Sequence, residues 1–329
     1  MTTTARETSA TTRGLTYLST RPVIALLVIL VILFGITALR DPSLFTAFGV
    51  RSILLLACPL AIMAAAQTLC MLTGGIDLSM AMTANLAAYV CAVNADLGPV
   101  TAIVLAFATG AVVGLVTGVG VGVFGVNALI MTLGISSVLV GVVTVGIVGN
   151  GFLAGSTTVL PVITSISAGT LAGPIPRNTV VLAVVTVLLV WGLARTGLGR
   201  NIYAVGDNPA AARLSGVRTW RVLVAVYVLA GMLAALAGLI FSGVSGAVGP
   251  DQTNAYLLPA IAAAVIGGTS ILGGVGGFGG AIVGALTLTV LNRLLLGLHT
   301  SDAVRQIIYG AIVLGMAWLY VRVTGRRAS

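Results

Sequence analysis

The sequence contains no lysine and little charge of either sign. Its sixteen basic residues are all arginine, and charged residues make up 7% of the 329 residues, against roughly 25% in soluble domains. Without lysine, the chain cannot form a phosphate-binding loop of the G-x-x-x-x-G-K-[ST] type. An ATP site of that kind is therefore excluded from this chain.

Cysteine and histidine are also scarce. Cys58, Cys70 and Cys91 lie in apolar runs without a C-x-x-C pair, and the chain has a single histidine. This pattern argues against disulfides and against a metal site. We expect the three cysteines to be small buried side chains, and we expect this chain to bind no metal or other cofactor.

Apolar residues are abundant instead. They make up 58% of the chain, and no charged residue occurs between Asp96 and Arg177 or between Val222 and Pro250. Because a membrane-spanning helix needs about 20 apolar residues, we predict an all-α, polytopic membrane bundle of about ten transmembrane helices. The expected spans are 22–39, 52–72, 78–95, 98–118, 127–149, 178–194, 222–243, 257–273, 276–297 and 304–321.

The arginines predict the orientation of these spans. Three precede the first span and five lie within 195–221, and cytoplasmic loops carry an excess of basic residues. The net charge of +9 thus indicates membrane orientation rather than nucleic-acid binding. We expect a cytoplasmic tail (1–21), a transmembrane domain (22–321) with a cytoplasmic loop (195–221) and an external loop (150–177), and a second cytoplasmic tail (322–329). Whether residues 156–176 of the external loop re-enter the membrane stays open.

Glycines recur every four residues in two predicted spans. They are Gly110, Gly114, Gly118 and Gly122, then Gly276, Gly280 and Gly284. Such stripes let helix backbones approach closely in lipid, so we expect them to mediate helix packing. Both regions also match G-x-G-x-x-G, but neither follows a predicted strand, which argues against dinucleotide binding.

A short capped helix is predicted in the cytoplasmic loop. Asn208 suits the N-cap, Pro209 the first helical position and Gly216 the C′ position. Isolated helices shorter than ~12 to 15 residues are marginal in water, so this helix needs something to pack against. Either it lies on its own membrane domain, or it docks in a groove of a cytoplasmic partner.

One acid, Asp77, stands between two almost purely apolar runs. It follows Gly74 and Gly75, so it could cap a helix beginning at Leu78 by accepting amide hydrogens near Ser79 and Met80. Alternatively, a polar group at a break in a membrane helix is a functional candidate. In that case Asp77 lies beside a substrate pathway whose other polar residues are Gln67, Thr73, Ser79, Asn85 and Asn127.

Four stretches carry a resemblance to a known family. They are TGGIDLS (73–79), NALIMTLG (127–134), YAVGDNPAAARLSGV (203–217) and AIAAAVIGGTSILGGVGG (260–277). In order and spacing, from about residue 50 to 320, they resemble the permease subunits of ribose-, xylose- and arabinose-type carbohydrate ABC importers.

This resemblance implies a transport subunit rather than an enzyme. It implies a permease dimer in the bacterial inner membrane, an external solute-binding protein, and a separate ATPase subunit that binds ATP and Mg²⁺. The residues that would contact the ATPase are Gly206, Asp207, Asn208, Pro209, Ala210, Ala211, Ala212, Arg213, Leu214, Ser215 and Gly216. The sequence leaves open whether the second permease is an identical copy or a paralogue.

The solute is expected to be a pentose or hexose, with alternatives kept open. In AYLLPAIAA, Leu257 and Pro259 stand where carboxylates are frequent in the family. Another small polar solute, such as a nucleoside, a polyol or a signal sugar, is therefore a second candidate. An ion-coupled secondary transporter is a third, and it would need a titratable group deep in the membrane, for which Asp77 is the strongest candidate.

Overall fold

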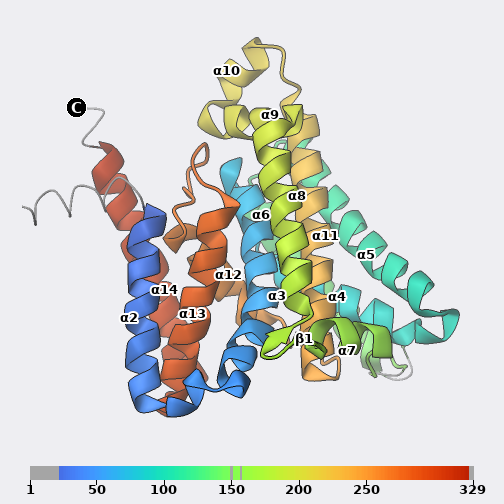
Figure 1. Ribbon diagram of the computed structural model, residues 1–329. Coiled ribbons are helices and arrows are strands. Elements are labelled where there is room, and N and C mark those ends of the chain that lie inside the picture. Colours follow the sequence, from blue (N-terminus) through green and yellow to red (C-terminus); the bar gives the residue numbers. More distant parts are fainter. Residues whose placement is uncertain (1–21, 149–150, 156–157, 326–329) are drawn as a thin grey trace, which may run out of the picture.

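The computed structural model describes residues 22–148, 151–155 and 158–325 (Figure 1). The predicted tail 1–21 and residues 326–329 lie outside the described residues. In chain order the elements are α2 (Pro22–Arg40), η1 (Pro42–Phe45), α3 (Ala47–Leu72), α4 (Met80–Val93), η2 (Ala95–Leu97), α5 (Pro99–Gly122), α6 (Ala128–Ile147), α7 (Pro161–Ala168), β1 (Thr170–Ala172), β2 (Ile175–Pro176), α8 (Asn178–Arg195), α9 (Gly197–Asp207), α10 (Pro209–Leu214), α11 (Thr219–Ser245), η4 (Asn254–Tyr256), α12 (Leu257–Ile266), α13 (Phe278–Gly297) and α14 (Asp302–Gly325).

The predicted all-α membrane class is confirmed. Six helices of the described chain, α3, α5, α6, α8, α11 and α13, are long and apolar enough to cross a membrane. A helix lies in each of the ten predicted ranges, but α4 and α12 have only 14 and 10 residues. At 1.5 Å per residue, α12 reaches about 15 Å, half of the hydrocarbon core.

The bundle has two distinct ends (Figure 1). Helices α9 and α10 cover one end, here called the α10 end. At the opposite end, the η1 end, lie η1, α7 and the antiparallel β1–β2 hairpin, which pairs Thr170 with Pro176. The segment 156–176, predicted to be a loop, thus holds a short helix and a hairpin in its described part rather than a membrane-length helix.

Helices α3 and α11 form the core, and the glycines of α5 allow close packing against α11. A Cβ atom built on Gly114 would overlap the carbonyl of Tyr227 and lie 2.8 Å from the Val228 Cα. Gly110 lies in the same way against the backbone of Gly231. In lipid, where apolar surface gains nothing by leaving its surroundings, such close backbone contact is a main source of helix association.

The second glycine stripe differs from the prediction. Gly280 and Gly284 of α13 face the backbones of Gly267 and Ala263, but Gly276 lies in a loop before α13 with φ 147°. The expected span 257–273 is also wrong in extent, because α12 ends at Ile266. The residues that follow include four glycines with positive φ, which cannot continue a right-handed helix; they are Gly268, Gly273, Gly274 and Gly276.

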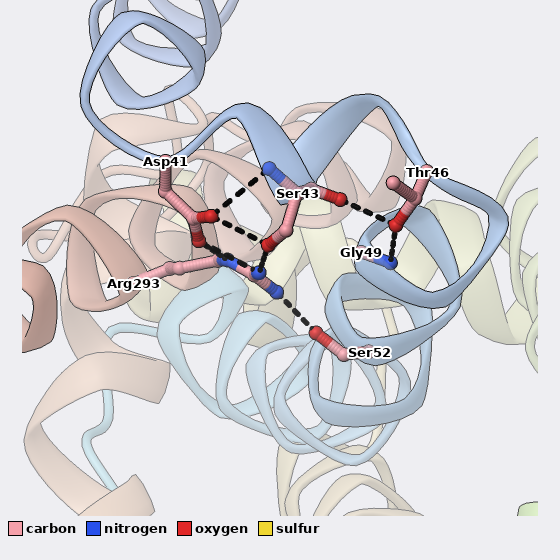
Figure 2. Close-up of polar contacts among 6 residues, drawn as sticks. All are labelled: Asp41, Ser43, Thr46, Gly49, Ser52 and Arg293. Carbon is pink, nitrogen blue, oxygen red and sulfur yellow. Dashed lines mark hydrogen bonds and ion pairs between the residues drawn. The ribbon is translucent and has the colours of Figure 1, made fainter.

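A polar brace closes the η1 end (Figure 2). Arg293 of α13 forms an ion pair with Asp41, its Nη2 lying 2.8 Å from Oδ2, and also donates hydrogen bonds to Ser52 of α3 and to Ser43. The other carboxylate oxygen of Asp41 accepts from the backbone N–H of Ser43 at 3.1 Å. The brace therefore ties the α2–α3 turn to α13.

The brace predicts an acid-sensitive stability. Hydrogen bonds from Ser43, and then from Arg293, hold the pKa of Asp41 below its usual value of 3.8. A lowered carboxyl pKa stabilises the fold above the unfolded-state pKa, and this contribution is lost as the pH falls through the folded value. The melting temperature of purified protein should therefore drop between pH 6 and pH 3, and should drop less in Asp41→Asn.

The matched control is Asp96→Asn, which removes an acid from η2, outside the brace. It should keep the wild-type drop in melting temperature. An equal acid sensitivity of wild type and Asp41→Asn would contradict the role given to the brace.

Candidate functional site

The four stretches that carry the family resemblance meet at the α10 end. The backbone N–H of Gly274 donates to the carbonyl of Leu72 at 3.1 Å, and the hydroxyl of Tyr203 on α9 donates to the carbonyl of Gly276 at 2.9 Å. Thr132 of α6 donates to the carbonyl of Ile76 at 3.3 Å. Segments that are up to 200 positions apart in the sequence therefore form one assembly beneath α9 and α10.

Four glycines form the centre of this assembly: Gly74, Gly206, Gly273 and Gly274, here called the glycine junction. Gly206 is buried in α9, and a Cβ atom built on it would overlap the Leu72 carbonyl oxygen and lie 2.6 Å from the Gly274 nitrogen. A Cβ on Gly273 would lie 2.7 Å from the carbonyl oxygen of Gly206 and 3.0 Å from the nitrogen of Gly74. Helix α9 thus rests with its backbone directly on two loops, 73–79 and 267–277.

Helix α9 was not predicted from the sequence. Its N-cap is Thr196, whose hydroxyl accepts from the backbone N–H of Gly199 at 3.1 Å. Ile202 and Val205 are buried, and Leu198 packs against the same core. The spacing of Leu198, Ile202 and Val205, at i, i+4 and i+7, is the signal of an amphipathic helix that could have revealed it.

Helix α10 has the predicted caps. The side-chain oxygen of Asn208 accepts from the backbone N–H groups of Ala210 and Ala211, each at 3.0 Å. At the other end Gly216 has φ 84°, and the N–H of Val217 donates to the carbonyl of Ala212 at 3.0 Å. This is the Schellman arrangement, which explains why a helix of six residues ends sharply there.

The two faces of α10 have different surroundings. Ala212 is buried in the core of the bundle. On the other face Leu214 is 91% exposed, and Arg213, Arg218 and Arg221 of the same loop are exposed as well. The helix therefore packs on its own membrane domain and still presents an exposed apolar side chain, in a loop that also carries exposed arginines.

Asp77 lies in the loop that joins α3 to α4 and is 4% exposed. Its Oδ1 accepts from the backbone N–H of Ser79 at 2.8 Å and from the Ser79 hydroxyl at 2.6 Å. Helix α4 begins at Met80, two residues later than predicted. The carboxylate thus organises the turn before the helix as expected, but the N-cap position is held by Ser79 and not by Asp77.

The other residues predicted to line a pathway do not join Asp77 and Ser79 through hydrogen bonds. Thr73 donates to the carbonyl of Cys70 at 2.8 Å, and Asn85 donates to the carbonyl of Pro250 at 2.5 Å. Asn127 caps α6 by accepting from the N–H of Leu129 at 2.9 Å. Gln67 is fully buried in α3, and its side-chain amide has no hydrogen-bond partner among the described residues.

Comparison with known proteins identifies the class of this chain. Residues 49–317 match the family described as branched-chain amino acid transport system / permease component, and the chain belongs to this family of ABC importer permeases. No solved structure matches the chain.

Individual relatives are named as import permeases for ribose, for galactose and methyl galactoside, and for autoinducer 2. The chain is 37% identical over 292 residues to the ribose import permease protein RbsC of Escherichia coli (strain K12), covering 88% of this chain and 90% of RbsC. It is 32% identical over 308 residues to the galactose/methyl galactoside import permease protein MglC of Haemophilus influenzae, covering 88% of this chain and 91% of MglC. It is 34% identical over 300 residues to the autoinducer 2 import system permease protein LsrC of Yersinia pseudotuberculosis serotype O:3, covering 89% of this chain and 82% of LsrC.

Replacing the buried glycine of α9 should loosen this end of the bundle. In Gly206→Ala the new methyl group overlaps backbone atoms that cannot rotate away, and overpacking of this kind costs about 1–3 kcal/mol. Trypsin should then cut after Arg213 and Arg218 on the order of tenfold faster, because cleavage follows the population of the opened loop. Cleavage is measured by mass spectrometry of timed digests.

The control for this experiment is Gly197→Ala at the start of α9. A Cβ there meets only the Arg200 side chain, at 3.8 Å, so its digestion rate should stay that of the wild type. Equal digestion of wild type and Gly206→Ala would mean that the glycine junction does not hold α9 in place.

Two substitutions of Asp77 distinguish the contribution of its acceptor oxygen to stability from the contribution of its negative charge. Asp77→Ala removes both hydrogen bonds to Ser79 and leaves buried donors unpaired, which costs about 1–3 kcal/mol. Asp77→Asn keeps an acceptor oxygen and should therefore lose much less stability than Asp77→Ala. Thermal unfolding of the two purified variants tests this, and an equal loss in both would show that the charge, not the turn, is what matters.

Proposed function

We propose that this chain is the permease subunit of an ABC importer that moves a sugar of the pentose or hexose class across the bacterial cytoplasmic membrane. The relatives named above are import permeases for ribose, for galactose and methyl galactoside, and for autoinducer 2. The observation that carries the proposal is the exposed face of α10, held over the glycine junction. A signal sugar is the second candidate, favoured by the similarity to LsrC.

In this proposal the chain crosses the membrane ten times, with α4 and α12 extended to full crossings by the loops 73–79 and 267–277. The direction of the helices supports it, because α2 begins and α14 ends toward the α10 end (Figure 1). Arg195, Arg200, Arg213, Arg218 and Arg221 all belong to this end. By the positive-inside rule it is the cytoplasmic end, and the η1 end faces the solute-binding protein.

The partner at the cytoplasmic end is the ATPase subunit, which binds ATP and Mg²⁺. Residues 206–216 form the contact: Leu214 enters an apolar groove of the ATPase, and the exposed arginines of the loop meet acidic groups on the ATPase. When ATP closes the ATPase, the force on α10 passes to α9 and through the glycine junction to both loops. A second permease copy completes the pathway, and we propose a homodimer.

An exposed leucine provides the test of this contact. Leu214→Asp places a charge where the proposal requires an apolar side chain, so the ATPase should no longer copurify with the permease and ATP-dependent uptake of ribose or galactose into vesicles should fall at least tenfold. The fold should be unaffected, because Leu214 is 91% exposed. The sugar-loaded binding protein should still dock, as measured by pull-down.

The matched control is Leu97→Asp, since Leu97 is 61% exposed at the opposite end of the bundle. The ATPase should still copurify with the Leu97→Asp permease. Uptake by the wild-type chain alone, without ATP, would overturn the importer proposal and restore Asp77 as a candidate ion-coupling site.

A further inference from the structure

A cavity of about 460 Å³ opens near the η1 end, between α3, α12, α13 and α14. It is here called the outer cavity. Its volume lies within the roughly 300–1,000 Å³ of small-molecule sites. None of the residues that the sequence predicted for a solute pathway lines it.

The wall of the outer cavity is polar on three sides. Asn254 comes from η4, Asn292 from α13, and Gln306 from α14. Each supplies an amide, which both donates and accepts hydrogen bonds. The rings of Tyr256 and Tyr309 add flat surfaces with a polar tip. This alternation of donors and acceptors around apolar surface fits a solute with several hydroxyl groups.

Each charged residue of the cavity wall has at least one hydrogen-bond partner within the protein. Arg305 forms an ion pair with Asp302, and its Nη1 donates to Asn292 Oδ1 at 3.0 Å. Asp251 accepts from the side-chain amide of Asn254. A neutral polyol can use the remaining hydrogen-bonding capacity of the amides without displacing these partners. The cavity therefore favours a neutral solute.

The family departure noted in the sequence lies at this same place. Pro259 lines the outer cavity together with Leu56 and Leu60 of α3. The wall formed by α12 thus lacks a carboxylate at this position, and the polar groups come instead from η4, α13 and α14. Recognition of hydroxyl groups here depends on amides rather than on acids.

We propose that the outer cavity binds a neutral sugar of pentose or hexose size after its release from the binding protein, with Asn254 and Gln306 as hydrogen-bonding residues. This inference rests on the proposed importer function and adds the place where the permease first holds its solute. The site lies at the η1 end, opposite the glycine junction.

The test uses the complete transporter, with ATPase and binding protein, in vesicles supplied with labelled D-ribose and D-galactose. Gln306→Leu removes an exposed amide and should not disturb folding, whereas Asn254→Leu also removes the hydrogen bond to Asp251, so the folded state of both variants is checked by thermal unfolding. Both should lower the number of sugar molecules moved per ATP hydrolysed on the order of tenfold, the factor of a lost hydrogen bond to a polar solute. Gln252→Leu, a change of an amide outside the cavity, should not lower it.

The outcomes separate the two proposals. ATP-dependent uptake that is equal in wild type, Gln306→Leu and Asn254→Leu would overturn the sugar site and leave the importer function intact. Loss of ATPase stimulation by the loaded binding protein in these variants would make the cavity a docking surface for that protein, and would also overturn the sugar site. No ATP-dependent uptake of either sugar by the wild type would overturn both proposals.

Discussion

The packing of the helices depends on close backbone-to-backbone contacts, which glycine makes possible because it has no Cβ atom. Surrounded by lipid, helices gain little from burying apolar side chains, so close van der Waals contact replaces the hydrophobic effect as the source of their association. Along α5 this contact is made to α11 at Gly110 and Gly114, and between α12 and α13 at Gly267 and Gly280. Each approach leaves no room for a Cβ atom, so the arrangement of the core follows directly from where glycine stands in the sequence.

The same constraint accounts for the interrupted helices. A break in a membrane helix frees backbone N–H and C=O groups, which must find partners inside the protein. The two breaks after α3 and α12 do so in part with each other: Gly274 donates to Leu72, and Asp77 satisfies the turn before α4. Because α9 covers both breaks through Gly206, helices α9 and α10 and the interrupted helices form one mechanical unit.

Local signals in the sequence were sufficient where local interactions decide the structure. The caps of α10 depend on Asn208 and Gly216 alone, and both were predicted correctly. The helical class followed from apolar runs long enough to leave no alternative in lipid. The contact of Asp77 with Ser79 was likewise predictable, since it joins residues two positions apart.

Other features depend on contacts between distant segments and could not be read from periodicity. Hydropathy predicted a span that continues past the end of α12 at Ile266 to residue 273, and it placed Gly276 in a helix. A hydropathy profile records only the polarity of residues and contains no information on positive φ. The outer cavity combines residues of η4, α13 and α14 that no single motif contains. Helix α3 contacts both functional regions, since Leu56 and Leu60 line the cavity and Leu72 accepts a hydrogen bond at the junction. The continuous helix α3 therefore joins the glycine junction to the wall of the outer cavity and gives the two ends of the bundle a direct physical link.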